Sequence, residues 1–204
     1  MFITFEGIDG CGKSTQAELL AERLRSATKD PVVLVRDPGN TSVAEAIRAI
    51  ILSQKYTIRA RTELLLFAAA RAELVDTIIR PALDSGNIVI ADRFADSTVA
   101  YQAFGRGVPI DDVVQVNAVA TRGLVPCLTF FLSIPLVVAQ ERLKGKNADR
   151  IERSGEAFFQ RVVGGYEFLV HREPSRVIRL DGLQPIETLH EEIWLRVCQH
   201  LVCR

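Results

Sequence analysis

Residues 7–14 read Gly-Ile-Asp-Gly-Cys-Gly-Lys-Ser, which matches the pattern G-x-x-x-x-G-K-[ST]. A bulky apolar run at 1–5 precedes the match, and apolar residues recur at helical spacing through 13–27 after it. In a glycine-rich loop between a strand and a helix, backbone N–H groups curl around phosphates and the helix adds the positive end of its dipole. This context predicts a nucleoside triphosphate site and disfavours the alternative of a plain glycine-rich turn.

Individual side chains of this loop carry chemistry. Lys13 is expected to reach the β- and γ-phosphates, and the Ser14 hydroxyl is expected to ligate Mg²⁺. Asp92 follows the apolar run Ile88–Ala91 and resembles a metal-side acid at a strand end, although many strands end in Asp. The chain lacks the N-K-x-D guanine motif of GTPases, so for 204 residues a small-molecule kinase is the favoured class.

The rest of the chain alternates between short apolar runs and amphipathic stretches. Further strands are expected at 31–36, 87–91, 126–132 and 176–180. Further helices are expected at 43–52, 62–84, 96–104, 111–122, 137–143, 156–172 and 186–201. Strands that alternate with helices predict an α/β fold, with a five-stranded parallel sheet covered by helices on both faces. No linker or repeat interrupts the pattern, so one domain spanning residues 1–204 is expected.

Composition narrows the possible partners and the compartment. Lys plus Arg and Asp plus Glu are 25 each, and this balance argues against a general nucleic-acid coat protein. No apolar run reaches about 18 residues, and acidic residues interrupt the first one, so neither a membrane span nor a signal peptide is expected. The four cysteines form no C-x-x-C pair or zinc spacing, which favours reduced thiols and a cytoplasmic location.

Several longer segments together point to one family. They are FEGIDGCGKST (5–15), RDPGNT (36–41), LFAAAR (66–71), DRFADSTVAYQAFGRG (92–107) and DRIE (149–152). In order and spacing the chain resembles the bacterial thymidylate kinases from end to end. The resemblance implies a three-layer P-loop fold with a short lid at about 144–153, and Mg²⁺-dependent transfer of the ATP γ-phosphoryl group to dTMP. It also implies a homodimer.

The resemblance implies how the acceptor base and sugar are read. Phe67 would stack on thymine, and Arg71, which offers only donors, would bond O4 and reject cytosine. Thr98 or Gln102 would accept from N3–H, and Tyr101 would lie beneath the sugar and exclude a 2′-hydroxyl. Phe67 and Arg71 are four residues apart and share a helix face; without the resemblance, core packing would be the favoured role of Phe67.

The resemblance also assigns the acceptor phosphate and the acids near it. Arg93 would hold the dTMP phosphate, with Arg48 and Ser97 as further dTMP contacts; Arg48 could instead be a surface arginine, and Arg36 is a weaker candidate. Asp9 and Asp37 would hold Mg²⁺-bound water or the sugar 3′-hydroxyl. The implied metal-binding residues are Ser14, Asp9 and Asp92. The implied ATP-binding residues are Gly7, Ile8, Asp9, Gly10, Cys11, Gly12, Lys13, Ser14, Thr15 and Arg142, with Arg142 stacking on adenine.

One branch of the family places an arginine where this chain has Gly10, and the other branch supplies cations from the lid. Gly10 therefore implies a lid cation that acts with Lys13, Asp9 and Arg93 in catalysis. Arg150 is the first choice and Lys146 and Arg153 are the reserves, with Lys144 also in the segment. The alternative is that this segment is only a solvated charged loop.

The chain departs from the family pattern after the second expected strand, where Asp37 replaces the usual Glu and Asn40 replaces a Gly. Asp37 is one methylene shorter, which puts its reach in doubt, whereas Asn tolerates the left-handed backbone. Two other functions stay open: a kinase for another nucleotide on this scaffold, and a nucleotide-binding switch without catalysis. The set Phe67, Arg71 and Gln102 argues against the first alternative, and the basic lid argues against the second.

Overall fold

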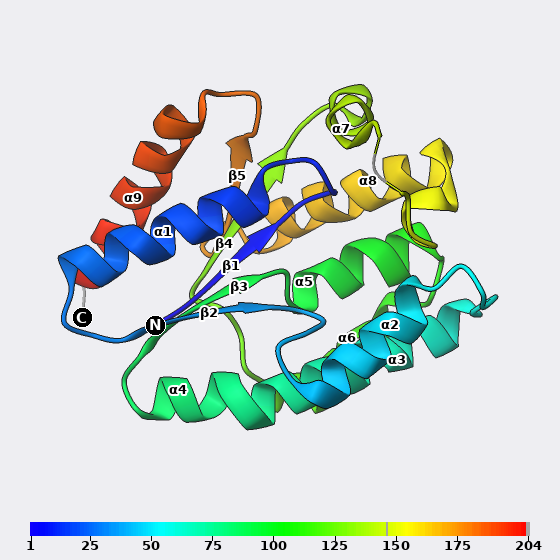
Figure 1. The fold of residues 1–204 in the computed structure, drawn as a ribbon, viewed down its shortest axis with the longest axis horizontal. Coiled ribbons are helices and arrows are strands. Elements are labelled where there is room, and N and C mark those ends of the chain that lie inside the picture. Colours follow the sequence, from blue (N-terminus) through cyan, green and yellow to red (C-terminus); the bar gives the residue numbers. More distant parts are fainter. Residues whose placement is uncertain (146, 203–204) are drawn as a thin grey trace.

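The computed structural model describes residues 1–145 and 147–202, and these residues surround one parallel sheet (Figure 1). The sheet order is β2-β3-β1-β4-β5. The strands are β1 (Phe2–Glu6), β2 (Val32–Arg36), β3 (Ile88–Asp92), β4 (Leu128–Ser133) and β5 (Val177–Asp181). The five expected apolar runs therefore all form strands, which confirms the predicted sheet.

Helices connect the strands as expected from the amphipathic pattern. They are α1 (Lys13–Ala27), α2 (Ser42–Leu52), α3 (Ala60–Leu74), α4 (Arg80–Asp84), α5 (Ala95–Thr98), α6 (Ile110–Thr121), α7 (Leu136–Leu143), α8 (Glu156–Arg172) and α9 (Ile186–Val202). The expected helix 62–84 is divided by a π-helical stretch, η1 (Val75–Ile79), and the expected helix 96–104 consists of α5 and a second π-helical stretch, η2 (Val99–Gly105). A short 3₁₀ helix, η3 (Glu152–Ser154), lies in the lid segment.

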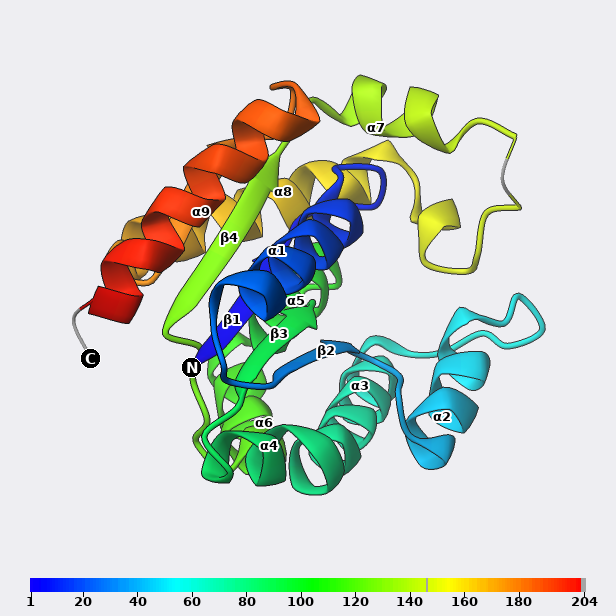
Figure 2. The same ribbon diagram turned by 60° about the vertical axis from the view of Figure 1, so that its left-hand side comes forward.

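The sheet lies between two helical layers. Helices α1 and α9 lie side by side on one face, and α3, α4, α5, α6 and α8 cover the other (Figures 1 and 2). The buried residues of α1 include the predicted apolar stripe Ala17, Leu20, Ala21 and Leu24. Strand β1 is buried along its whole length, because the sheet is covered on both faces.

The carboxyl ends of the strands meet at one edge of the sheet. There Phe5 pairs with Asp92, Arg36 pairs with the same Asp92, and Ser133 pairs with Asp181. Ligand sites in open α/β sheets lie at this edge, so the loops that follow β1, β2 and β3 are expected to form the site. None of the helices in the described part of the chain is long and apolar enough to cross a membrane.

Candidate active site

The glycine-rich loop 7–12 connects β1 to α1, and helix α7 closes over it. Gly10 has a φ of 83°, and a Cβ atom there would lie 2.9 Å from the carbonyl oxygen of Ala139 in α7. A larger residue would therefore need both a strained backbone and a shift of α7. Position 10 thus has no room for the arginine that one branch of the family carries there.

A groove runs along this loop and the start of α1. Its lining residues are Gly10, Cys11, Gly12, Lys13, Ser14, Thr15, Gln16, Arg142, Leu143, Gly182, Gln184, Ile186 and Leu189. Arg142 donates from Nη1 to the carbonyl of Gly10 (3.0 Å) and from Nη2 to that of Gly182 (3.4 Å), which holds its guanidinium at the groove. Of the predicted loop contacts, Gly7 and Ile8 are buried at the start of the loop and do not line this groove, and Asp9 lies elsewhere.

Two side chains with oxygen atoms that could ligate a metal lie next to each other between α1 and β3. The Ser14 hydroxyl donates to Oδ2 of Asp92 at 2.5 Å, and Oδ1 of Asp92 is a buried oxygen without a hydrogen-bond partner among the described residues. The described residues contain no group of three or more His, Cys, Asp or Glu that could hold a metal. Mg²⁺ commonly takes one or two protein oxygens and fills its shell with phosphate oxygens and water, so this pair fits it.

Asp9 connects the loop to a second cavity. Its Oδ1 accepts from Lys13 Nζ and from Arg93 Nη2, both at 2.8 Å. Burial alone would raise the pKa of the Asp9 carboxyl, but Arg93 and Lys13 together hold that pKa well below its usual range. Asp9 is therefore an ionised bridge between the lysine of the loop and an arginine of the second cavity.

Asp9 also lines a second cavity, whose walls combine polar and apolar side chains, as is common in sites for small ligands. Its lining residues are Asp9, Asp37, Pro38, Arg48, Leu52, Phe67, Arg71, Arg93, Ser97, Thr98, Tyr101, Gln102, Asp149 and Ile151. Apart from the weaker candidate Arg36, the structure thus brings together every residue predicted to bind the acceptor nucleotide. Pro38, Leu52, Asp149 and Ile151 were not predicted, and Arg36 lies outside, against Glu45.

Arg93 lies at the end of β3 with its guanidinium held on all sides. Its backbone has a φ of 72°, a left-handed conformation that is uncommon for a residue other than glycine. Nη1 donates to the hydroxyls of Ser97 (3.2 Å) and Tyr166 (3.1 Å), and Nη2 donates to Asp9 and to the Tyr101 hydroxyl (3.2 Å). A strained backbone held by several side chains is typical of a functional position.

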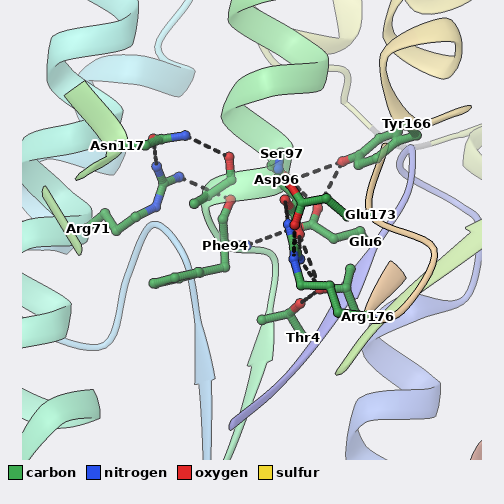
Figure 3. Close-up of polar contacts among 12 residues, drawn as sticks. Thr4, Glu6, Arg71, Phe94, Asp96, Ser97, Asn117, Tyr166, Glu173 and Arg176 are labelled. Atoms are coloured by element: carbon green, nitrogen blue, oxygen red, sulfur yellow. Dashed lines mark hydrogen bonds and ion pairs between the residues drawn. The ribbon is translucent and has the colours of Figure 1, made fainter. Parts of the chain in front are cut away.

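Glu6 is a fully buried carboxylate that contacts Phe94, Ser97 and Tyr166, and no sequence pattern predicted it (Figure 3). It accepts from the backbone N–H of Phe94 (2.8 Å) and from the hydroxyls of Ser97 (2.5 Å) and Tyr166 (3.0 Å). Burial raises the pKa of Glu6 to about 7; the negative charge of Asp96 adds to the shift and Arg93 opposes it. Glu6 therefore supports two of the hydroxyls that position Arg93.

Arg71 is 1% exposed and is also held by other side chains (Figure 3). Its Nε donates to Oδ2 of Asp37 (2.5 Å), Nη1 to Oδ1 of Asn117 (2.8 Å) and Nη2 to the carbonyl of Phe94 (3.2 Å). A guanidinium has five N–H donors, so two remain for a ligand. Oδ1 of Asp37 is buried without a partner among the described residues.

Gln102 is bonded to Glu63, a second buried carboxylate that was not predicted. Gln102 Nε2 donates to Oε1 of Glu63 at 2.9 Å. Arg106 Nε also donates to Oε1 (3.0 Å), and Arg150 Nη2 lies 2.7 Å from Oε2. Glu63 precedes Phe67 and Arg71 by four and eight residues, so the shared helix face was a usable signal.

The lid residues are not gathered at the glycine-rich loop in this structure. Besides Glu63, Arg150 contacts the Ile51 carbonyl through Nε (2.7 Å), and it lines neither cavity. Lys144 pairs with Glu141, and Arg153 donates from Nε to the carbonyl of Ala148 (3.3 Å). Lys146 lies outside the described residues. The catalytic role expected of Arg150 and Lys146 therefore stays a prediction.

Comparison with known proteins gives consistent results. Residues 5–193 match the family model described as thymidylate kinase. The thymidylate kinase of Kosmotoga olearia is 44% identical over 204 residues, which cover 100% of this chain and 96% of the relative. That of Fervidobacterium nodosum is 45% identical, with 95% of this chain and 96% of the relative covered. Among solved structures, thymidylate kinase from Ehrlichia chaffeensis superposes with a TM-score of 0.79 at 34% identity and covers 97% of this chain and 98% of that one.

Proposed function

The chain belongs to the thymidylate kinase family, and on that premise we propose how its residues divide the transfer of a phosphoryl group to dTMP. It is a nucleoside-monophosphate kinase that converts dTMP to dTDP. The observation that carries the assignment of residues is the Asp9 bridge, which joins Lys13 of the groove to Arg93 of the cavity. ATP occupies the groove, dTMP occupies the cavity, and the phosphoryl group crosses where the two meet.

On the donor side, the backbone N–H groups of residues 10–15 hold the phosphates of ATP, and Lys13 contacts the β- and γ-phosphates. Gly7 and Ile8 shape the start of the loop from buried positions. Arg142 stacks on adenine from the far wall of the groove, where the Gly10 and Gly182 carbonyls hold its guanidinium.

Ser14 and Asp92 would hold Mg²⁺, and Asp9 would meet it through a bound water. The unpartnered Oδ1 of Asp92 supports this assignment, because a buried carboxylate oxygen without a partner is costly. When bound, Mg²⁺ would neutralise charge that develops on the transferring group.

On the acceptor side, Phe67 stacks on thymine and the two remaining N–H groups of Arg71 meet O4. Thr98 and Gln102 face N3–H. The Tyr101 ring lies beneath the deoxyribose, where it packs edge-on against Phe158 and Phe159 and so cannot move aside for a 2′-hydroxyl.

The acceptor phosphate is held by Arg93, with Arg48 and Ser97 beside it in the cavity. The free Oδ1 of Asp37 accepts from the sugar 3′-hydroxyl. Asp37 is one methylene shorter than the usual Glu of the family, yet it lines the cavity.

We also propose that the lid supplies a cation to the transferring group, because Gly10 cannot. Arg150 lies against Glu63, so it would have to leave that carboxylate to reach the phosphates. Lys146 is therefore the stronger candidate of the two. The chain as a whole acts as one kinase domain.

The assembly we propose is a homodimer formed through α3 and α6. Leu65 is 53% exposed and Val119 80% exposed, and both line one shallow apolar groove between these helices. A patch of this kind favours a protein interface over open solvent. We expect Val119→Glu to shift sedimentation from dimer to monomer.

Free Cys11, Cys127 and Cys198 support a cytoplasmic location.

A coupled assay of ADP release tests the function. With dTMP, dUMP, dCMP and AMP as acceptors, turnover should be fastest with dTMP. A preference for another base would assign the scaffold to a different monophosphate kinase. Nucleotide binding without turnover of any acceptor would instead indicate a nucleotide-binding switch without catalysis.

A further inference from the structure

We propose that Glu63 determines base specificity by locking the side-chain amide of Gln102, so that its oxygen faces the nucleotide base. Glu63 is a positioning residue here, since it acts through Gln102. The proposal rests on the proposed function of the cavity as the dTMP site. Held by Glu63, the Gln102 amide would make this site select an imide base, which carries N3–H, over a base whose N3 carries no hydrogen.

Glu63 is positioned to impose one orientation. It is 0% exposed on α3, and Gln102 is 1% exposed on η2 directly opposite. The bond between them, Nε2 to Oε1 at 2.9 Å, uses the nitrogen of the amide. The amide oxygen of Gln102 takes no part in this bond, and Gln102 lines the cavity.

The chemistry of Glu63 excludes the flipped amide. Arg106 donates to both of its oxygens, at 3.0 and 3.3 Å, and Arg150 lies 2.7 Å from Oε2. A carboxylate between guanidinium groups only accepts hydrogen bonds. Turning the Gln102 amide would place oxygen against oxygen and leave a buried NH₂ group without its partner. Glu63 therefore fixes which end of the amide faces the base.

This orientation matters because the bases differ at N3. Thymine offers a donor there, whereas neutral cytosine has no hydrogen on N3 and offers an acceptor. Thr98 cannot discriminate, because a hydroxyl both donates and accepts and Thr98 Oγ1 has no partner to fix it in the described residues. Gln102 discriminates only while its amide is held.

In two places in the cavity, a buried carboxylate fixes the orientation of a neighbouring polar side chain. Asp37 holds the Arg71 guanidinium at 2.5 Å, and Glu63 holds the Gln102 amide. One buried carboxylate thus fixes a donor for O4, and the other fixes an acceptor for N3–H. The two together match the edge of an imide base.

Glu63→Gln tests the proposal with a predictable direction. The new amide oxygen should take the Oε2 side, where the Arg150 guanidinium lies 2.7 Å away and Arg106 Nη2 donates. The new NH₂ group then lies on the Oε1 side, toward Gln102, and Arg106 Nε has to give up its bond there. The Gln102 amide would then reverse and present NH₂ to the base. The measurement is the ratio of kcat/KM for dTMP to that for 5-methyl-dCMP, which keeps the methyl group and differs only at N3 and position 4. We expect this ratio to fall at least about tenfold, the scale of one mispaired hydrogen bond.

Two further variants distinguish an effect on the orientation of the Gln102 amide from a general loss of folded structure. Arg106→Gln removes a partner of Glu63 but keeps its bond to Gln102, so the ratio should stay within about twofold of wild type. In the double variant Glu63→Gln with Gln102→Glu, residue 102 becomes a carboxylate that only accepts, so the ratio should return toward wild type. A role in folding alone would give no such rescue.

The outcomes are distinct. A wild-type enzyme that does not prefer dTMP contradicts the proposed function itself. A wild-type enzyme that prefers dTMP, with an unchanged ratio in folded Glu63→Gln, overturns only the role of Glu63. Should circular dichroism show that Glu63→Gln is unfolded, Gln102→Met decides: a ratio lowered at least about tenfold supports the amide contact, and an unchanged ratio overturns the proposal.

Discussion

In the cavity around Phe67, polar side chains are buried and bonded to one another, whereas the groove beside Lys13 is lined by a backbone loop with exposed Ser14 and Thr15. Arg71 makes three hydrogen bonds within the protein while it is 1% exposed. Arg142, on the groove side, donates its hydrogen bonds within the described residues to two backbone carbonyls. The polar groups of the proposed acceptor site thus hold one another in place, whereas the proposed donor site consists mainly of backbone groups.

The start of α5 shows how the acceptor side is assembled. Glu6 from β1 binds its first N–H groups, and Arg71 from α3 binds the carbonyl of Phe94 (Figure 3). Asp96 in α5 pairs with Arg176 at 2.7 Å. Such preorganised contacts suit recognition of one base, whereas backbone N–H groups suit phosphates, which are the same in every nucleotide. Changes on the donor side should therefore lower turnover, and changes on the acceptor side should alter the choice of nucleotide.

The largest effect should come from Lys13→Ala, on the donor side. Loss of the amine that meets the β- and γ-phosphates should lower kcat at least about 100-fold, the scale of one preorganised charge-stabilising group. Asp9 keeps Arg93 as a partner, so the fold should persist. Lys29→Ala, at an exposed lysine after α1, is the matched control and should leave kcat unchanged. Near-normal turnover of Lys13→Ala with dTMP would refute the assignment of the loop.

Arg71→Lys should alter nucleotide choice while it keeps a cation beside the buried Asp37. A lysine cannot reproduce the guanidinium fork, so kcat/KM for dTMP should fall about ten- to a hundredfold, as expected for a lost charged hydrogen bond. The gap between dTMP and 5-methyl-dCMP should narrow. Equal losses on both substrates would show that Arg71 does not read position 4 of the base.

Two lid residues should have different effects, one on kcat and the other on the KM for dTMP. Lys146→Ala should lower kcat at least about tenfold with little change in either KM, because a transition-state cation acts mainly on kcat. Arg150→Ala should instead raise the KM for dTMP, because Arg150 pairs with Glu63 of the acceptor side. A kcat defect confined to Arg150→Ala would return the catalytic role to that residue.

The smallest effect concerns Glu6 and pH. Its pKa is about 7 in the folded protein against 4.5 for an ordinary Glu, so between these values the folded state keeps a proton that the unfolded chain has lost. Stability should therefore fall as pH rises through this window, by on the order of 1 kcal/mol or more. Urea unfolding at pH 5 and pH 8 should show a steeper loss for wild type than for Glu6→Gln. Burial lowers the pKa of His190, which acts in the opposite direction but equally in both proteins.

The parts of the molecule that the sequence predicted are those with local signals. Apolar runs located each strand to within two residues, and the glycine pattern located the loop before α1. Phe67 and Arg71 share a helix face, and the acceptor cavity contains both. Glu63 carries the same spacing, but an acid on a helix usually faces water, so the spacing alone does not predict a buried carboxylate.

Other residues had no local signal. Asn117 and Tyr166 meet Arg71 and Arg93 only through the packing of α6 and α8. Glu6 lies within a strand, where alternation alone does not show that the helix N-terminus of α5 will cover it. The pairing of Arg150 with Glu63 joins residues far apart in the chain, so a reading of the lid as a separate segment could not anticipate it.

The most direct test of this account compares dTMP with 5-methyl-dCMP on the wild-type enzyme. Both nucleotides fit the same cavity and carry the same phosphate and sugar, so only the hydrogen-bond pattern of the base differs. A site whose buried donor and acceptor are fixed in advance should favour dTMP in kcat/KM by about 10⁴-fold, the range seen where a mismatch leaves buried polar groups unpaired. Values for the two substrates within about tenfold of each other would contradict a preassembled, base-reading acceptor site.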